Sequence, residues 1–532
     1  MFDMAYTKEY LTIRYAAAPV GPLRWKAPRP PKIERSYVQN ASNFSARCPQ
    51  APSVLSFTEG PGYAGDEDCL FLNVYSPLNA SNLPVFVFEH GGGYGCGDGT
   101  YSPLDLMAAN NNTFISVIPQ YRLGAFGFLS SPEVYQQGDL NVGLLDQRFA
   151  FQWVQDNIGQ FGGDPSRVTI GGQSAGGGSV MLHAISQSHG NHPPLFTGVI
   201  ASSPYLPGQA KFHDIKVIEK YYRFAAAVGC LDHQYMSIFE CLQTRDTQEL
   251  QRANYIMTQQ APFGSWTFTP VTDNYYININ PYSTGARNIQ GLRVLTGNTA
   301  VEGPFFTPES IKTAADYRHF LVSHFTHFTC NDFKEHSISY PPTSCTLKTP
   351  FASSGDGNPS ALETSSYAVG YQQLAYAVTD EMAFTCPSYY LAGIFANGGL
   401  PAYKYQYSRT AAHHASDLFV LGFLPSPAEM HITEGLRLEL QRAWGNFILG
   451  KSPGWDVYTS KNPVMYNFNT TGGESSLYTI SNYTAVINSG DVTMASRVVN
   501  AREWEGNRGE RCDFWERVRS RPYLESDIGS GW

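Results

Sequence analysis

A serine between two glycines is the first residue of the sequence that could do chemistry. It lies in Gly172-Gln-Ser-Ala-Gly176, after the β-branched run 168–170 and before a segment, 179–186, that favours a helix. Glycines two residues before and after Ser174 allow a sharp strand-to-helix turn that exposes the hydroxyl group. The pattern predicts a nucleophilic serine, although Gly-x-Ser-x-Gly also arises by chance in a chain with 49 glycines.

A serine hydroxyl is a weak nucleophile, so this prediction requires a histidine base and an acid that orients it. Candidates follow two later segments with the pattern of buried strands. Glu302 lies in a glycine-bounded loop after residues 292–296, and His413 and His414 follow residues 402–407. The chain order of serine, acid and histidine is the order expected when the last two lie on loops after later strands of one sheet.

A second glycine run could supply an oxyanion hole. His90-Gly-Gly-Gly-Tyr94 directly follows an apolar segment, 83–88, with the pattern of a buried strand. Consecutive glycines let backbone N–H groups turn toward a developing negative charge without side chains in the way. A plain tight turn is the alternative, and a phosphate-binding loop is excluded because no Gly-Lys-Ser/Thr follows.

These residues lie among alternating strand-like and helix-like segments. Strands that alternate with helices favour a largely parallel sheet with helices on both faces. With no linker or internal repeat, residues 1–532 are expected to form one domain, with long helix-bearing insertions at 205–290 and 304–375. Strands are expected at 68–75, 83–88, 114–121, 197–202, 292–296 and 402–407, and an amphipathic helix at 141–157.

The composition excludes several classes of function. The formal charge is −9 and no basic run occurs, which argues against a nucleic-acid partner. No apolar run reaches the length of about 18 residues that a membrane helix needs. The 13 histidines show no His-Glu-x-x-His or similar spacing, so neither a metal nor another cofactor is expected. Aromatic residues make up 14% of the chain, which suits an apolar gorge or a large core.

Cysteines and glycosylation motifs indicate a secretory route. The chain has nine cysteines, and oxidising compartments are where disulfides form. Its first residues lack the pattern of a signal peptide, so we expect a secreted protein whose signal is missing from this chain. The Asn-x-Ser/Thr motifs, for which chance occurrence is the alternative, are at Asn40, Asn43, Asn79, Asn111, Asn469 and Asn482.

Motifs along nearly the whole chain resemble the type-B carboxylesterase/lipase family, the cholinesterase-like branch of the α/β-hydrolases, with a fungal character. The resemblance implies an α/β-hydrolase fold, with a central, mostly parallel sheet, helices on both faces and large helical insertions. It also implies Ser174 as nucleophile, Glu302 as acid, and an oxyanion hole from the backbone N–H groups of Gly92, Gly93 and Ala175. The matching motifs are Ile13-Arg-Tyr-Ala16, Pro19-Val-Gly-Pro-Leu-Arg-Trp25, Glu67-Asp-Cys-Leu-Phe-Leu-Asn-Val74, His90-Gly-Gly-Gly-Tyr94, Asn157-Ile-Gly-Gln-Phe-Gly-Gly-Asp-Pro165 and Gly172-Gln-Ser-Ala-Gly176.

The same resemblance distinguishes the two histidines. The family pattern has an acidic residue three positions after the catalytic histidine, and Asp417 is three positions after His414, so His414 is expected to be the base. His413 is then a solvated or structural neighbour, and Asp417 is expected to be a helix-capping or loop residue.

The family resemblance also implies a set of disulfides. Cys330 and Cys345 remain as a further pair by elimination, and Cys96 is expected to be unpaired, buried and inert. The implied disulfides are Cys48–Cys69, Cys230–Cys241 and Cys386–Cys512.

Three features depart from the family pattern. Gln173 replaces the glutamate that often precedes the nucleophile, which should alter the pH profile without abolishing activity. The N-terminal strands that usually precede Ile13 are largely missing, so the chain looks truncated. The loop between Cys48 and Cys69 has no tryptophan to contact a quaternary ammonium group, which disfavours a choline ester as substrate.

Together the motifs predict a serine carboxylic ester hydrolase that forms an acyl-enzyme on a small-molecule or lipid ester. An acyltransferase that uses the same residues is the first alternative. A non-catalytic binding module of the same fold is the second, and it is disfavoured because Ser174, Glu302 and His414 are all present.

Overall fold

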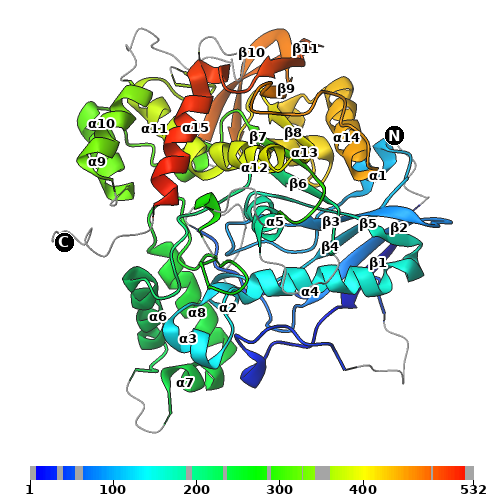
Figure 1. The fold of residues 1–532 in the computed structure, drawn as a ribbon, viewed down its shortest axis with the longest axis vertical. Coiled ribbons are helices and arrows are strands. Elements are labelled where there is room, and N and C mark those ends of the chain that lie inside the picture. The colour runs from blue at the N-terminus through cyan, green and yellow to red at the C-terminus, as the bar shows by residue number, and fades with distance from the viewer. Residues whose placement is uncertain are drawn as a thin grey trace.

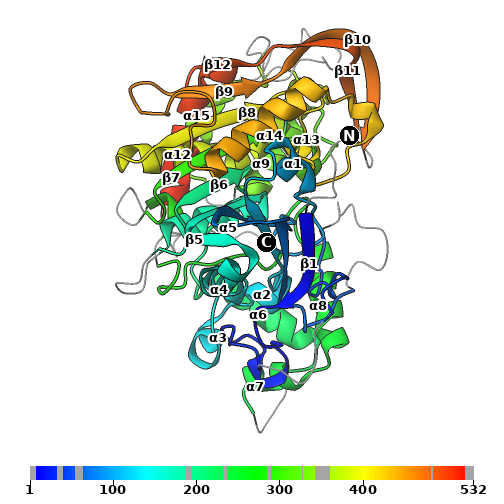
Figure 2. The ribbon, with the colours of Figure 1, turned by 90° about the vertical axis from the view of Figure 1, so that its right-hand side faces the viewer.

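A computed structural model describes residues 7–32, 40–53, 64–186, 194–231, 236–278, 280–283, 289–325, 328–341, 360–362, 364–480 and 483–521. Within these residues, ten strands form one sheet that runs from β1, near the middle of the molecule, to β9 and β12 near its top (Figures 1 and 2). In spatial order they are β1 (Thr7–Arg14), β2 (Phe71–Pro77), β4 (Ile115–Pro119), β3 (Leu83–Glu89), β5 (Gly163–Gln173), β6 (Gly198–Ser202), β7 (Arg293–Thr299), β8 (Ala402–Tyr407), β9 (Val464–Phe468) and β12 (Arg497–Asn500).

The sheet is parallel except at its two ends. Strands β4, β3, β5, β6, β7, β8 and β9 pair in parallel, whereas β1, β2 and β12 are antiparallel to their neighbours. The predicted mostly parallel sheet is confirmed. Because the carboxyl ends of parallel strands share one edge, the loops after β3, β5, β7 and β8 converge there.

Side-chain alternation along β3 shows why helices cover both faces. Val85 and Val87 pack in one apolar core, and Phe86 and Phe88 pack in another on the opposite face. The first core is covered by α4 (Val142–Asn157), α5 (Ala175–Ile185) and α12 (Cys386–Asn397). The second is covered by α1 (Leu104–Ala109), α13 (Ser416–Leu421) and α14 (Glu434–Ile448).

The two predicted insertion segments carry helices at opposite ends of the molecule. Helices α6 (Ile215–Ala227), α7 (Ile238–Thr244) and α8 (Thr247–Gln259) lie at the bottom of Figure 1, beside α2 (Gly124–Phe128) and α3 (Pro132–Gln137). Helices α9 (Ala314–His324), α10 (Cys330–Ser339) and α11 (Gly370–Asp380) lie at the upper left, next to the C-terminal helix α15 (Trp504–Ser520).

A long two-stranded ribbon lies outside the main sheet. Strands β10 (Thr470–Ile480) and β11 (Tyr483–Met494) pair with each other and form the top of the molecule in Figure 2. The sequence did not predict this ribbon, because its strands are rich in threonine, serine and glycine and lack an apolar run.

The structure contains the three disulfides that the resemblance implies. They join Cys48 to Cys69, Cys230 to Cys241, and Cys386 of α12 to Cys512 of α15. Cys96 is unpaired and partly buried, and burial raises the pKa of its thiol to about 12, so the thiol stays protonated near neutral pH. Cys330 is exposed at the start of α10, and Cys345 lies outside the described residues.

The predicted glycosylation sites differ in exposure. Asn469 is only 3% exposed and its side chain accepts a hydrogen bond from the Thr470 backbone, so the folded chain does not present this side chain at its surface. Asn482 lies outside the described residues. The exposed candidates are Asn40, Asn43, Asn79 and Asn111. Among the described residues, no helix is both long and apolar enough to cross a bilayer.

Candidate active site

Ser174 lies at the sharp turn between β5 and α5, as its glycine-flanked sequence predicts. Its φ of 58° and ψ of −124° are unfavourable for a residue with a side chain. A Cβ atom on Gly176 would lie 2.0 Å from the Glu89 carbonyl oxygen, and one on Gly172 would lie 2.4 Å from the Gly176 carbonyl carbon. Both glycines are therefore needed for the close approach of β5, α5 and β3.

His414 and Glu302 come together from the loops after β8 and β7. The Nδ1 atom of His414 donates a hydrogen bond to Glu302 Oε2 at 2.5 Å. Glu302 is fully buried, and its other oxygen accepts from the Ser203 hydroxyl at 2.6 Å and from the Thr299 N–H at 2.8 Å. This arrangement fixes the tautomer: because Nδ1 carries the proton, the Nε2 atom of His414 has a free lone pair.

The Nε2 atom of His414 faces the residue next to the serine. The side-chain amide nitrogen of Gln173 lies 3.2 Å from Nε2, and Gln173 is buried, with 3% of the residue exposed. Since Nε2 is the acceptor, the Gln173 amide is the donor. No hydrogen bond joins Ser174 to His414 among the described residues, and such contacts often tighten only when substrate binds.

His413 and Asp417 are both buried. His413 is 1% exposed, its ring stacks on Tyr478, and burial lowers its pKa to about 4, so it is a neutral structural residue and not a solvated one. Asp417 is not a helix cap: it accepts hydrogen bonds from the hydroxyl groups of Ser202 and Tyr405. Burial raises the pKa of Asp417 to about 6.

The glycine run after β3 packs directly against the serine. A Cβ atom on Gly91 would lie 3.0 Å from the Cβ atom of Ser174. Gly92 and Gly93 have φ values of 108° and 63°, and the loop is held by hydrogen bonds from the Tyr121 hydroxyl to the His90 carbonyl at 2.7 Å and within the glycine run itself. Positive φ and the lack of space for a Cβ atom explain the glycines. Ala175 begins α5 next to Ser174, so the three predicted oxyanion donors lie on segments that meet at this serine.

Aromatic side chains from three distant segments surround the site. The ring of Trp266 covers Gly93, where a Cβ atom would lie 2.1 Å from the indole. The rings of Phe306 and Phe384 lie 5.0 and 4.4 Å from that of His414, and Tyr205 packs against Trp266. Sequence reasoning missed these residues, because Trp266 and Phe306 lie in or next to insertions that have no readable motif.

Further titratable groups are buried near Glu302. Its backbone N–H contacts Asp380 at 3.3 Å, and burial raises the pKa of Asp380 well above its ordinary value. Lys404 is also fully buried and donates to Asn298 and Ser388. In the described part of the chain, no three His, Cys, Asp or Glu side chains cluster in a way that could hold a metal ion.

Comparison with known proteins agrees with the fold. The model of the carboxylesterase family matches residues 3–483, and the chain belongs to this family. The crystal structure of Aspergillus niger EstA superposes with a TM-score of 0.75 at 25% identity and covers 98% of this chain and 97% of that one. A PNB esterase superposes with a TM-score of 0.69 at 26% identity, covering 87% and 92%.

Two relatives illustrate the range of the family. Secreted lipase 4 of Gibberella zeae is 29% identical over 409 residues, which are 75% of this chain and 70% of the lipase. Acetylcholinesterase of Electrophorus electricus is 32% identical over 320 residues, 57% of this chain and 49% of that protein. The match therefore spans about half the length of the acetylcholinesterase.

Proposed function

We propose that this protein is a serine carboxylic ester hydrolase that works through Ser174, His414 and Glu302 and an acyl-enzyme intermediate. The observation that carries the proposal is the hydrogen bond between His414 Nδ1 and the buried Glu302, on loops next to a serine held in a strained turn. A buried acid that fixes the histidine tautomer leaves Nε2 as a base, and the sharp turn places the serine at the carboxyl end of its strand, the position of a catalytic nucleophile in this kind of turn.

In the proposed reaction, His414 Nε2 takes the proton of Ser174 as Oγ attacks the ester carbonyl. Glu302 stabilises the imidazolium that forms. The N–H groups of Gly92, Gly93 and Ala175 donate to the tetrahedral oxyanion, each contributing about 3 kcal/mol to the transition state. His414 then protonates the leaving alcohol, and water, activated by the same nitrogen, releases the acid. For the first step, the Gln173 amide must release Nε2, which a rotation of its side chain achieves.

The aromatic wall favours an apolar, uncharged ester. Trp266, Phe306 and Phe384 surround the glycine loop and His414 and offer no charged group to the substrate. Relatives include a protein named a secreted lipase and others named esterases, which supports an uncharged ester, whereas the acetylcholinesterase shows that the names alone do not exclude a choline ester. The lipase and the three disulfides also support an extracellular location.

A p-nitrophenyl ester series from acetate to palmitate tests the proposal. We expect turnover by the parent protein and a loss in kcat on the order of 10⁴-fold or more in Ser174→Ala and Glu302→Gln. Ser179→Ala is the matched control, because it removes a buried hydroxyl from the same helix, one that accepts from Gln147 at 3.0 Å. A fluorophosphonate should add its mass to the parent and not to Ser174→Ala.

Equal turnover by the parent and Ser174→Ala would contradict the proposal. Product analysis with an added primary alcohol distinguishes hydrolysis from acyl transfer, because only a transferase would yield mainly the new ester at low alcohol concentration.

A further inference from the structure

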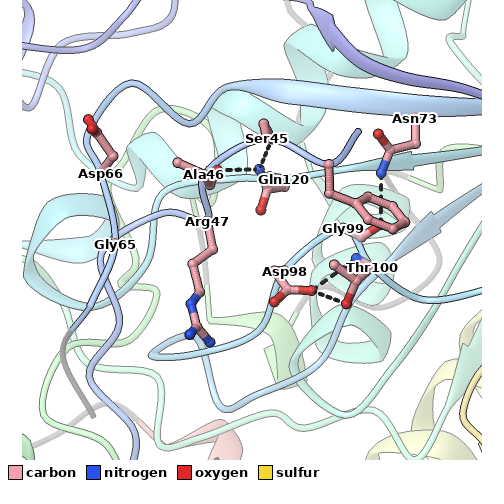
Figure 3. A pocket seen from close by; sticks show the side chains of 11 residues that line it. Ser45, Ala46, Arg47, Gly65, Asp66, Asn73, Asp98, Gly99, Thr100 and Gln120 are labelled. Carbon is pink, nitrogen blue, oxygen red and sulfur yellow. Dashed lines mark hydrogen bonds between the residues drawn. The ribbon is translucent and has the colours of Figure 1, made fainter. Parts of the chain in front are cut away.

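A cleft of about 540 Å³ is lined by residues that lie outside the candidate active site (Figure 3). Its walls come from four segments: residues 44–47, residues 65–66, strand ends at Asn73 and Gln120, and residues 98–100, which follow the glycine loop. The Cys48–Cys69 disulfide joins the first two segments, and the Asp66 N–H donates to the Arg47 carbonyl at 2.9 Å. A disulfide and a backbone hydrogen bond therefore hold two of the four walls together.

Gln120 presents a preoriented acceptor to this cleft. Its side chain is 4% exposed, and its amide nitrogen donates to Ser45 Oγ at 2.8 Å and to the carbonyl oxygens of Ala46 and Cys69 at 3.0 and 3.2 Å. These bonds fix the amide so that its oxygen points into the open space (Figure 3). No donor from the described residues reaches that oxygen. An amide oxygen that faces open space can accept a hydrogen bond from a ligand or from water.

Among the described residues, the charged groups of the cleft form no ion pairs with one another. Figure 3 shows Arg47 and Asp98 extending into the space below Gln120. In the described part of the chain, no ion pair joins Arg47 to Asp66 or Asp98. The hydroxyl and the backbone N–H of Thr100 both donate to Asp98 Oδ1, at 2.6 and 2.9 Å, and no described residue donates to Oδ2. One guanidinium and two carboxylates disfavour an anion as occupant.

We propose that this cleft binds a sugar ring, a neutral hexose or N-acetylhexosamine unit. Such a ring carries hydroxyl groups that donate to Gln120 and Asp98 and accept from Arg47, and one apolar face that packs on an aromatic ring. Phe44, which lines the cleft and is 46% exposed, offers that ring. This site goes beyond the proposed ester hydrolysis and does not depend on it.

The sugar could come from two sources. Asn43-Phe-Ser45 is itself a glycosylation motif, and Asn43 is exposed directly beside the cleft, so a glycan on Asn43 could fold back over Phe44. A free or polymeric saccharide is the other source, and both share the same recognition chemistry.

Saturation-transfer NMR on the full chain, with methyl β-glucoside, cellobiose and diacetylchitobiose as probes, tests the proposal. We expect millimolar binding that weakens about tenfold in Phe44→Ala and in Asp98→Asn. Asp98→Asn keeps the acceptor for Thr100 and replaces the free oxygen. Tyr135→Ala is the control, since Tyr135 is an exposed aromatic residue (52%) outside the cleft, and p-nitrophenyl ester turnover should stay unchanged in all three variants.

Two results would overturn the sugar site: no saccharide binds, or binding persists unchanged in both cleft variants. Binding of ethanolamine but of no saccharide would also overturn it in favour of a cation site. Repeating the titration on glycosylated parent and on Asn43→Gln separates the sources. Binding only to Asn43→Gln would assign the cleft to the protein's own glycan, and binding to both would assign it to an external saccharide.

Discussion

His414 is held from two sides, by Glu302 at Nδ1 and by Gln173 at Nε2. Other titratable groups near it are Asp417 on α13 and the neutral neighbour His413. The N–H of the neutral Gln173 amide donates to the Nε2 lone pair and places no charge beside the ring. A glutamate in the same position would instead favour the imidazolium. The residue before the nucleophile is therefore expected to set the lower pH limit of activity.

Gln173→Glu should move the acid limb of the kcat/KM profile to higher pH by about one unit. The new carboxylate stabilises the protonated histidine, which cannot act as a base, so activity is lost at a pH where the parent still works. Profiles of p-nitrophenyl butyrate hydrolysis between pH 4.5 and 9 measure the shift. Gln173→Met, which removes the donor without adding charge, is the control and should shift the limb far less; superimposable profiles for the Glu variant and the parent would contradict the prediction.

Trp266 is expected to limit the acyl chain. Its indole covers Gly93 and packs against Tyr205 and Phe306, next to the proposed oxyanion loop. Trp266→Ala opens space there, so kcat/KM should rise for long-chain relative to acetyl esters by about tenfold, the scale of one to two methylene groups in an apolar pocket. Trp153→Ala, which alters a partly buried tryptophan on α4, should leave the ratio unchanged. An unchanged ratio in Trp266→Ala would place the acyl chain elsewhere.

Among the elements, the β10–β11 ribbon supports the loop that carries the histidine. The backbone N–H of Asn488 donates to Thr410 Oγ1 at 3.2 Å, and Tyr478 packs beside His413 in a small apolar core with Ala485 and Ile487. This loop has positive φ values at Ala412 and Ala415, 49° and 69°, which cost energy in residues with side chains. The ribbon holds the loop in that conformation.

Tyr478→Ala should lower kcat about tenfold with KM within about twofold, because a loosened loop misplaces the base more than the substrate pocket. The adjacent residue provides the control: Leu477 lies on the outer face of the same strand and is 72% exposed, whereas Tyr478 is 3% exposed. Leu477→Ala should match the parent in kcat and in melting temperature. If Tyr478→Ala melts earlier but keeps the parental kcat at 25 °C, the ribbon stabilises the fold without positioning the histidine.

The sequence predicted the elements that are buried on both faces. Runs such as 83–88 and 402–407 became β3 and β8 almost residue for residue, because central parallel strands are rich in apolar and aromatic residues, although β8 also buries Lys404 and Gln406. The ribbon was not predicted, because only one of its faces is buried and the buried residues on that face, such as Tyr478 and Ile487, are scattered along the strands. At the site, spacing and family resemblance brought Glu302 and His414 together, but nothing local indicated that Trp266 would meet Gly93 or that Asp417 would bond to Ser202. Such contacts depend on tertiary packing.

For the molecule as a whole, buried ion pairs as well as a disulfide hold the C-terminal helix α15 against the core. Arg508 and Arg511 of α15 both pair with Glu381, which lies in the π-helical turn Glu381–Thr385 between α11 and α12. Glu381 also accepts from the Tyr340 hydroxyl at 2.6 Å. Helix α15 lies beyond residue 483, where the family match ends, yet it is bound to the same core as the candidate site.

Removing Glu381 should destabilise the fold strongly. Glu381→Gln removes the carboxylate that pairs directly with two buried guanidinium groups, and breaking a buried pair in this way costs about 3–5 kcal/mol. The matched control is Glu335→Gln, which breaks a pair with Arg517 on the same helix whose partners are 49% and 52% exposed, and which should cost less than about 1 kcal/mol. Thermal and urea unfolding with the disulfides intact measure both.

The pH dependence of that loss distinguishes charge from packing. Burial raises the pKa of Glu381, but Arg511 and Arg508 outweigh it, so the pKa lies below its ordinary value of 4.5. A carboxylate with a lowered pKa contributes its stability above the unfolded value and loses it as the pH falls through the folded one. The stability difference between the parent and Glu381→Gln should therefore be full at pH 7 and shrink as the pH falls below about 4.5. A difference that is constant with pH would mean that Glu381 acts through hydrogen bonding and packing alone, and that α15 is held mainly by its disulfide.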